Sequence, residues 1–108
     1  MNHHDAPVPT QTILVEASLA VDDREENYGH PAQNFEATAL LWSVVLGCTV
    51  SVRQVALCMV ALKVARELHS PKRDNLIDAC GYLRCIEKVQ DIGYDADYPH
   101  GICTGGKA

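Results

Sequence analysis

The sequence predicts an all-α fold, a four-helix bundle built on a C-terminal helical hairpin. Two long stretches that are compatible with helices, residues 52–69 and 72–92, lie on either side of Ser70-Pro71. Because so short a connection leaves no room for anything else, the two arms are expected to be antiparallel neighbours. Two signals place the start of the first arm. Gly47 is a natural stop for the preceding helix, and Ser51 with Gln54 forms an S-x-x-Q capping box.

The elements are expected in one domain, residues 10–93, between a flexible tail at 1–9 and a loose tail at 94–108. An approximate apolar stripe predicts a first helix over residues 10–21. The second should run over residues 31–46, with Pro31 in its first position. The third follows Ser51. For the fourth, Ser70 supplies an N-cap, Pro71 a first-turn proline, and Gly93 the end. Gly81 in its interior indicates close packing against another helix.

The central helices carry more apolar surface than one small domain can bury. Residues 55–62 show no polar face, and residues 39–46 contain only Ser43 as a polar side chain. A helix of a small domain should instead have one polar face. We therefore expect a homo-oligomer with a helical interface.

Composition excludes several classes of protein. A net charge of −5 over 108 residues argues against general nucleic-acid binding, although basic residues between 63 and 73 leave room for a small anionic ligand. No apolar run is long enough to span a membrane. The five cysteines, with no C-x-x-C spacing, are expected to be reduced, buried thiols rather than zinc ligands. The expected location is cytoplasmic.

An unusual charged stretch, residues 22–31, ends in Tyr-Gly-His-Pro. It is compatible with a solvated helix end followed by a turn. It is also compatible with a ligand-facing loop, because loops between rigid helices often carry binding residues. In the second case Arg24 would bind an anion, Tyr28 would stack or donate a hydrogen bond, and His30 or Asn34 would form hydrogen bonds.

The hairpin brings charged residues together. Folding back at Ser70 should place Arg66 near Asp74 and Lys63 near Asp78. These pairs can be structural, in which case partly exposed ion pairs contribute about 0–1 kcal/mol each. They can also belong to a pocket, since they interrupt an apolar wall and precede Gly81 and the polar ring of Tyr82.

A catalytic site here would perform metal-assisted attack on a phosphoanhydride. Asp74, Asp78 and a third carboxylate, with Glu36 among the candidates, would hold Mg²⁺. Lys63 and Arg66 would bind the phosphates. No nucleophile elbow or phosphate-binding loop is present, and we assign no catalytic residue.

The motifs R-E-E-N-Y-G-H-P-A-Q-N-F, K-V-A-R and D-N-L-I-D-A-C-G-Y resemble those of a family of small bacteriophage and prophage proteins of unknown function. The resemblance covers about residues 15–90. It implies a location in an infected bacterial host.

That family is in turn distantly similar to the MazG-type all-α nucleotide pyrophosphohydrolases. The similarity implies a helical oligomer that uses acidic residues and Mg²⁺ to cleave nucleoside triphosphates. The sequence departs from the MazG motifs at two places. Asn75 stands where the E-x-x-D motif ending at Asp78 has its first carboxylate, and Glu25-Glu26 is followed by Gly29 where E-E-x-x-E has its third.

Three functions are compatible with the sequence. The first is a Mg²⁺-dependent nucleoside triphosphate pyrophosphohydrolase. The second is a non-catalytic anti-defence protein that sequesters a host nucleotide signal, such as a cyclic nucleotide. The third is a helical interaction module that inhibits a host defence enzyme. A set of three or four converging carboxylates would favour the first function. Convergence of Arg24, Lys63 and Arg66 without such a set would favour the second, and a monomer with a large exposed apolar face the third.

Overall fold

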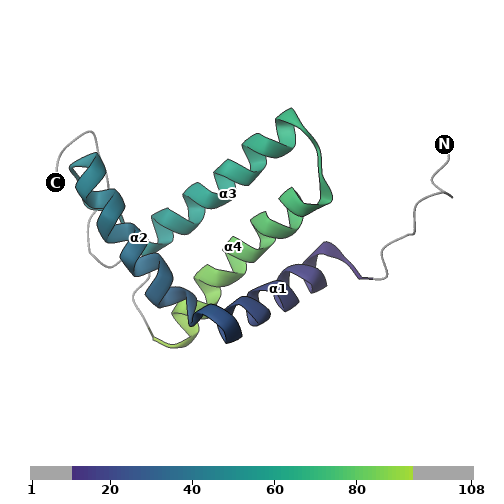
Figure 1. Cartoon of the computed structure of the whole chain (residues 1–108), viewed down its shortest axis with the longest axis horizontal. Coiled ribbons are helices and arrows are strands. Elements are labelled where there is room, and N and C mark those ends of the chain that lie inside the picture. Colours follow the sequence, from purple (N-terminus) through teal and green to yellow (C-terminus); the bar gives the residue numbers. More distant parts are fainter. Residues whose placement is uncertain (1–10, 94–108) are drawn as a thin grey trace, which may run out of the picture.

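The computed structural model describes residues 11–93, which form four α-helices and no strand. They are α1 (Ile13–Tyr28), α2 (Pro31–Leu46), α3 (Val52–His69) and α4 (Arg73–Asp91), shown in Figure 1. The predicted all-α fold with four helices is therefore confirmed. The tails expected at 1–9 and 94–108 lie outside the described residues.

Helix α4 is the centre of the arrangement and packs against each of the other three helices. The hairpin of α3 and α4 forms as predicted, and α1 lies along the other side of α4, so that α1, α4 and α3 are side by side (Figure 1). Helix α2 crosses one end of this layer, packs on α3 and α4, and projects beyond them. The arrangement is thus a three-helix layer with a fourth helix across its end.

The core lies where α2 meets the start of α3 and the end of α4. It is made of small aliphatic side chains, against which Phe35 and Trp42 pack; its buried members are Ala32, Ala39, Val50, Val52, Val55 and Val89. A second contact joins α1 to α4. There a Cβ placed on Gly81 would lie 3.5 Å from a methyl group of Val21, which is ordinary van der Waals distance. The two helices are therefore close at this point, as predicted.

Helix α1 is longer than the sequence suggested. Thr12 caps it, its hydroxyl accepting a hydrogen bond from the Val15 amide, and it continues through the charged stretch to Tyr28. The predicted end at residue 21 is wrong, because the polar turns are also packed: Lys88 of α4 forms ion pairs with Asp22 and Glu25. Residues 22–28 are therefore helical rather than a loop.

The junctions on either side of α2 follow the predicted signals. Gly29, at φ +90°, ends α1, and Pro31 opens α2. Gly47 closes α2 in the left-handed conformation, at φ +70°. The capping box of Ser51 and Gln54 is present in both directions, at 3.1 and 2.9 Å. The boundaries of α2 and the start of α3 are thus confirmed.

The turn between α3 and α4 is built differently from the prediction. Ser70 ends α3, its amide donating to the Arg66 carbonyl, and α4 begins only at Arg73 without a side-chain cap. The Glu67 carboxylate accepts hydrogen bonds from the Lys72 amide and from Asn75, and Asn75 also donates to the Ser70 carbonyl. The expected N-cap role of Ser70 is wrong, because Glu67 and Asn75 organise the turn instead.

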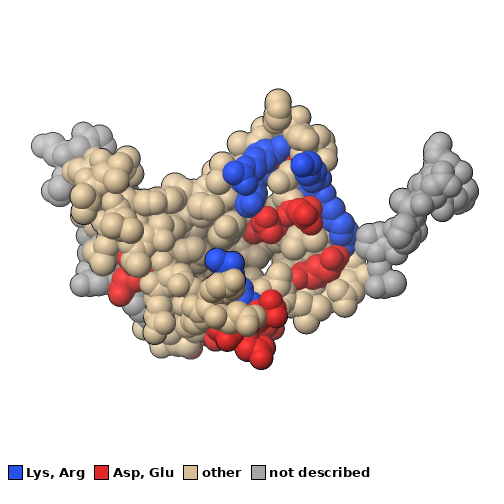
Figure 2. Space-filling model, in the orientation of Figure 1, with Lys and Arg blue, Asp and Glu red and all other residues tan. Residues whose placement is uncertain are grey.

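One of the two predicted ion pairs of the hairpin forms. Lys63 lies 2.9 Å from Asp78, whereas no pair between Arg66 and Asp74 is recorded in residues 11–93. Arg73 instead forms an ion pair with Glu16 and so fixes the start of α4 to α1. Figure 2 shows the lysine and arginine side chains gathered at this end of the molecule, beside carboxylates.

The cysteines depart from the expectation of buried, reduced thiols. Cys48 is disulfide-bonded. Cys58, Cys80 and Cys85 are free, but Cys58 is exposed. Cys103 lies outside the described residues.

Candidate functional site

A cleft of about 670 Å³ opens where the end of α1 and the start of α2 meet the middle of α3 and α4. Its volume lies within the range of small-molecule sites in proteins. All four helices contribute to its lining. The lining side chains that concern the chemistry are Asp23, Arg24, Glu25, Tyr28, Asn34, Phe35, Thr38, Met59, Asp78, Tyr82 and Cys85.

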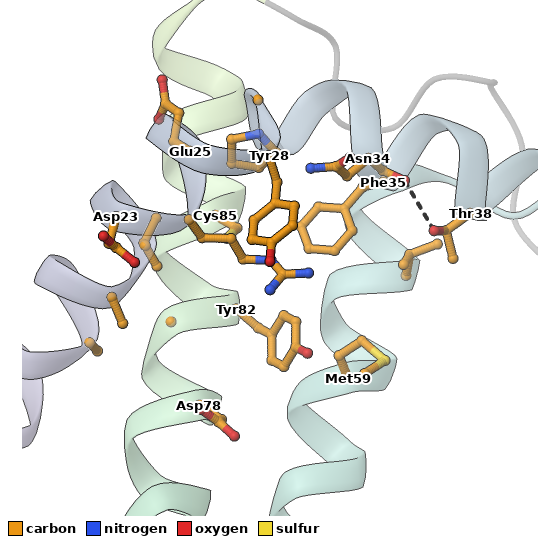
Figure 3. Close-up of a pocket in the computed structure, with 18 of the residues that line it drawn as sticks. Asp23, Glu25, Tyr28, Asn34, Phe35, Thr38, Met59, Asp78, Tyr82 and Cys85 are labelled. Carbon is orange, nitrogen blue, oxygen red and sulfur yellow. Dashed lines mark hydrogen bonds between the residues drawn. The ribbon is translucent and has the colours of Figure 1, made fainter.

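One side of the cleft is aromatic. The rings of Phe35 and Tyr82 lie 6.2 Å apart at 46°, a tilted pair that brings α2 to α4. Figure 3 shows Tyr28 beside these two rings, and Met59 of α3 facing the same space. Flat and polarisable surfaces of this kind bind planar ring systems by stacking.

Arg24 supplies a cation next to the aromatic rings. Its guanidinium carbon lies 4.8 Å from the centre of the Tyr28 ring, a cation–π contact on the last two turns of α1. No ion pair of Arg24 with a carboxylate is recorded within residues 11–93. The face of the ring therefore positions the guanidinium while its donors remain available for an anion.

The other two cations near the cleft are already bound to carboxylates. Lys63 pairs with Asp78, and Lys88 lies 2.7 Å from Glu25 and 3.3 Å from Asp22. The ion pair with Glu25, supported by Asp22, raises the pKa of Lys88 above its ordinary value. Lys88 therefore remains charged over the whole physiological range, and its main role is to clamp α1 to α4.

The predicted site residues are only partly brought together. Five of them line the cleft: Arg24, Tyr28, Asn34, Asp78 and Tyr82. Lys63 does not line it, but its ion-pair partner Asp78 does.

His30 and Arg66 do not line the cleft. The Nδ1 atom of His30 accepts a hydrogen bond from the Ala32 amide at 3.0 Å, so His30 is the N-cap of α2. Arg66 lies in a shallow depression at the α3–α4 turn, with His69 and Lys72.

The carboxylates expected to hold Mg²⁺ do not converge. Among the described residues, no group of three or more His, Cys, Asp or Glu side chains is close enough to bind a metal ion. Asp74, Asp78 and Glu36 accordingly do not form such a group, and of the three only Asp78 lines the cleft. The expected geometry of the metal site is therefore not formed by these three side chains.

Comparison with known proteins gives a family. Residues 12–90 match the model of a protein family described as a domain of unknown function, DUF6378. The chain belongs to this family. The match covers all of α1, α2 and α3 and nearly all of α4, so the whole cleft of this DUF6378 protein lies within the family domain.

Two curated relatives come from mycobacteriophages. The Gene 55 protein of Mycobacterium phage D29 is 37% identical over 84 residues, which are 76% of this chain and 56% of the relative. The Gene 55 protein of Mycobacterium phage L5 is 32% identical over 93 residues, 83% of this chain and 59% of the relative. The chain thus spans less than three fifths of each relative. These similarities support the predicted resemblance to phage proteins of unknown function.

No solved structure matches this DUF6378 chain. No helix within the described residues has the length and apolarity that a membrane span requires.

Several lining residues of the DUF6378 cleft were missed by the sequence reasoning. Phe35, Met59 and Cys85 all line it. The signal for Phe35 was available, because it directly follows Asn34 in the same motif as Tyr28. Cys85 follows Tyr82 by one helical turn. Burial raises the pKa of the Cys85 thiol, which stays protonated at neutral pH and contributes apolar surface.

A substitution at Gly81 is expected to change both the stability of the DUF6378 domain and the space in its cleft. A Gly in a helix interior costs about 1 kcal/mol relative to Ala. The nearest side-chain atom to a new Cβ is 3.5 Å away, and Gly81 also lines the cleft. We therefore expect Gly81→Ala to raise the free energy of unfolding by roughly 0.5–1 kcal/mol in urea titration, while it narrows the cleft. A fall in stability would show that the contact with Val21 does not accommodate a methyl group.

Proposed function

We propose that this protein binds a nucleotide in the cleft without turning it over, and so acts as a phage-type sequestering protein. The observation that carries the proposal is the combination of Arg24 and the ring of Tyr28, at 4.8 Å, with the tilted Phe35–Tyr82 pair in the same cleft. A nucleobase would stack on the aromatic side, and the guanidinium would bind a phosphate.

Binding without turnover is the better proposal for the carboxylates. Metal-assisted hydrolysis of a phosphoanhydride needs converging oxygen ligands. Here Asp78 pairs with Lys63, and Glu25 pairs with Lys88, so that both carboxylates are engaged by cations of the protein itself. Such a site suits a protein that binds a host nucleotide signal and thereby lowers its free concentration.

The test is a filtration experiment. Purified protein in molar excess is mixed with nucleoside mono-, di- and triphosphates and with cyclic nucleotides, with and without Mg²⁺, and the protein is removed by filtration. We expect at least one nucleotide to be missing from the filtrate and to be recovered intact after the retained protein is heated. Monophosphate with pyrophosphate in the filtrate would instead identify a pyrophosphohydrolase, and complete passage of every nucleotide would contradict the proposal.

A second proposal concerns assembly. We propose that the chain forms homo-oligomers through the outer half of α2, whose exposed side chains are apolar: Leu40, Leu41, Val44, Val45 and Leu46. No charged residue occurs in residues 37–46. Such a face is self-complementary, because an identical uncharged face satisfies it across a twofold axis. The same surface is the feature that a helical interaction module would use toward another protein.

A further inference from the structure

The charges of the cleft point to the class of nucleotide. Resting on the proposed function, we propose that the cleft accepts a nucleotide with a single phosphate group, a nucleoside monophosphate or a cyclic mononucleotide, and discriminates against di- and triphosphates.

One cation is available for a ligand. Lys63 is 2.9 Å from Asp78, with only 14% of its side chain exposed. Lys88 is held between Glu25 and Asp22, with 16% of its side chain exposed. Each lysine would have to leave a carboxylate unpaired in order to bind a phosphate. Arg24 is the remaining cation near the cleft, and within the described part of the chain it forms no ion pair with a carboxylate.

The carboxylates set the limit on negative charge. Asp23, Glu25 and Asp78 all line the cleft. Lys63 neutralises Asp78, whereas Lys88 is shared by Glu25 and Asp22, so that this group keeps one net negative charge. Asp23 is exposed and forms no ion pair within residues 11–93. Arg24 therefore offers one positive charge to a first phosphate, and any further phosphate meets Asp23 and the carboxylates around Lys88 without a cation of its own.

A triphosphate normally requires a different environment. Proteins that bind triphosphates surround them with several cationic or backbone donors and a bound Mg²⁺. The described residues contain no group of three or more acidic, histidine or cysteine side chains that would bring a metal ion to the cleft. The remaining lining groups, Asn34, Thr38 and Tyr82, are neutral and suit a base or a sugar.

The experiment compares a ladder of phosphates on the full chain. Dissociation constants are measured by equilibrium dialysis, without divalent cations, for the 5′-mono-, di- and triphosphates of adenosine, guanosine, cytidine and uridine, and for 3′,5′-cyclic AMP and GMP. For the nucleoside that binds, we expect the triphosphate to bind about tenfold more weakly than the monophosphate, because screened like charges oppose it. The cyclic compounds show whether a phosphodiester serves as well as a monoester.

A pair of charge-matched variants identifies the cause. Asp23→Asn removes the unpaired carboxylate of the cleft, and Glu26→Gln removes an exposed carboxylate of the same helix that does not line the cleft. Asp23→Asn should lower the dissociation constant of the triphosphate roughly threefold or more. Glu26→Gln should lower it only by the small effect of removing a screened, more distant charge. Triphosphates that bind as tightly as monophosphates would overturn this inference and leave the proposed function standing. Failure of every nucleotide to bind would overturn both.

Discussion

On the assembly proposed for α2, replacement of Val44 and Val45 by glutamate should leave the protein monomeric. These side chains are 80% and 81% exposed, on a half-helix without charges. Burial of a Val or Leu side chain stabilises an interface by about 1.5–3 kcal/mol, whereas a carboxylate in the same place must be desolvated without a partner. Two added charges per chain should therefore abolish association entirely.

Light scattering coupled to size exclusion measures this directly. The wild type should elute with a multiple of the 11.8 kDa chain mass, and the double variant with that mass itself. Gln33→Glu with Gln90→Glu is the matched control, since it adds the same charge at exposed positions away from this face. A wild type that is monomeric at high concentration, or a double variant that remains oligomeric, would contradict the proposed role of α2.

Among substitutions that change a single side-chain group, Asn75→Asp is expected to lose the most stability. Its amide donates to Glu67 and to the Ser70 carbonyl, both at 3.2 Å, and the residue is only 9% exposed. Asn75→Asp removes both donors and places a carboxylate against Glu67. Each unsatisfied buried group costs about 1–3 kcal/mol, so the variant should lose roughly 2–4 kcal/mol of unfolding free energy.

Thermal unfolding followed by circular dichroism is the measurement. For a domain of this size the loss corresponds to a fall in Tm of roughly 8 °C or more. Asn34→Asp is the control, because Asn34 is exposed and no hydrogen bond of its side-chain amide is recorded; its Tm should stay within a few degrees. Equal behaviour of the two variants would show that the turn does not depend on Asn75.

Asn75 also has a structural role in the turn between α3 and α4. The resemblance to MazG proteins would put Asn75 where their E-x-x-D motif has its first carboxylate. The structure places it in the turn between α3 and α4, where it must donate hydrogen bonds to Glu67 and Ser70. A carboxylate cannot donate these bonds when ionised. The local architecture therefore accounts for an amide at position 75.

Local signals in the sequence were sufficient for much of the fold. The boundaries of α2, the capping box of Ser51 and Gln54, and the pair of Lys63 with Asp78 all depend on residues close in sequence or on the short hairpin turn. The length of α1 depends on contacts with α4 more than sixty residues away, through Lys88. Periodicity cannot detect such contacts, and for this reason the charged turns resembled a loop.

The candidate site was predictable to a similar extent. The motif around Tyr28 and Asn34 and the residue Tyr82 do meet in one cleft. Arg66 was expected near Asp74 through the fold-back at Ser70, but α3 extends past the cleft before Ser70 ends it, and Arg66 lines the shallow depression at the turn. His30 was chosen for its chemistry, yet its ring is occupied as the cap of α2. Side-chain direction and capping decided these outcomes.

The most direct test of the nucleotide site is the affinity of Arg24→Ala for the nucleotide recovered in the filtration experiment, with Arg66→Ala beside it. Both variants remove one exposed arginine from a helix, but only Arg24 lines the cleft. A hydrogen bond to a charged group contributes about 1.5–3 kcal/mol, so the dissociation constant should rise roughly 10- to 100-fold for Arg24→Ala and should not change for Arg66→Ala. Equal dissociation constants for the two variants, or a loss only with Arg66→Ala, would contradict a nucleotide site in this cleft.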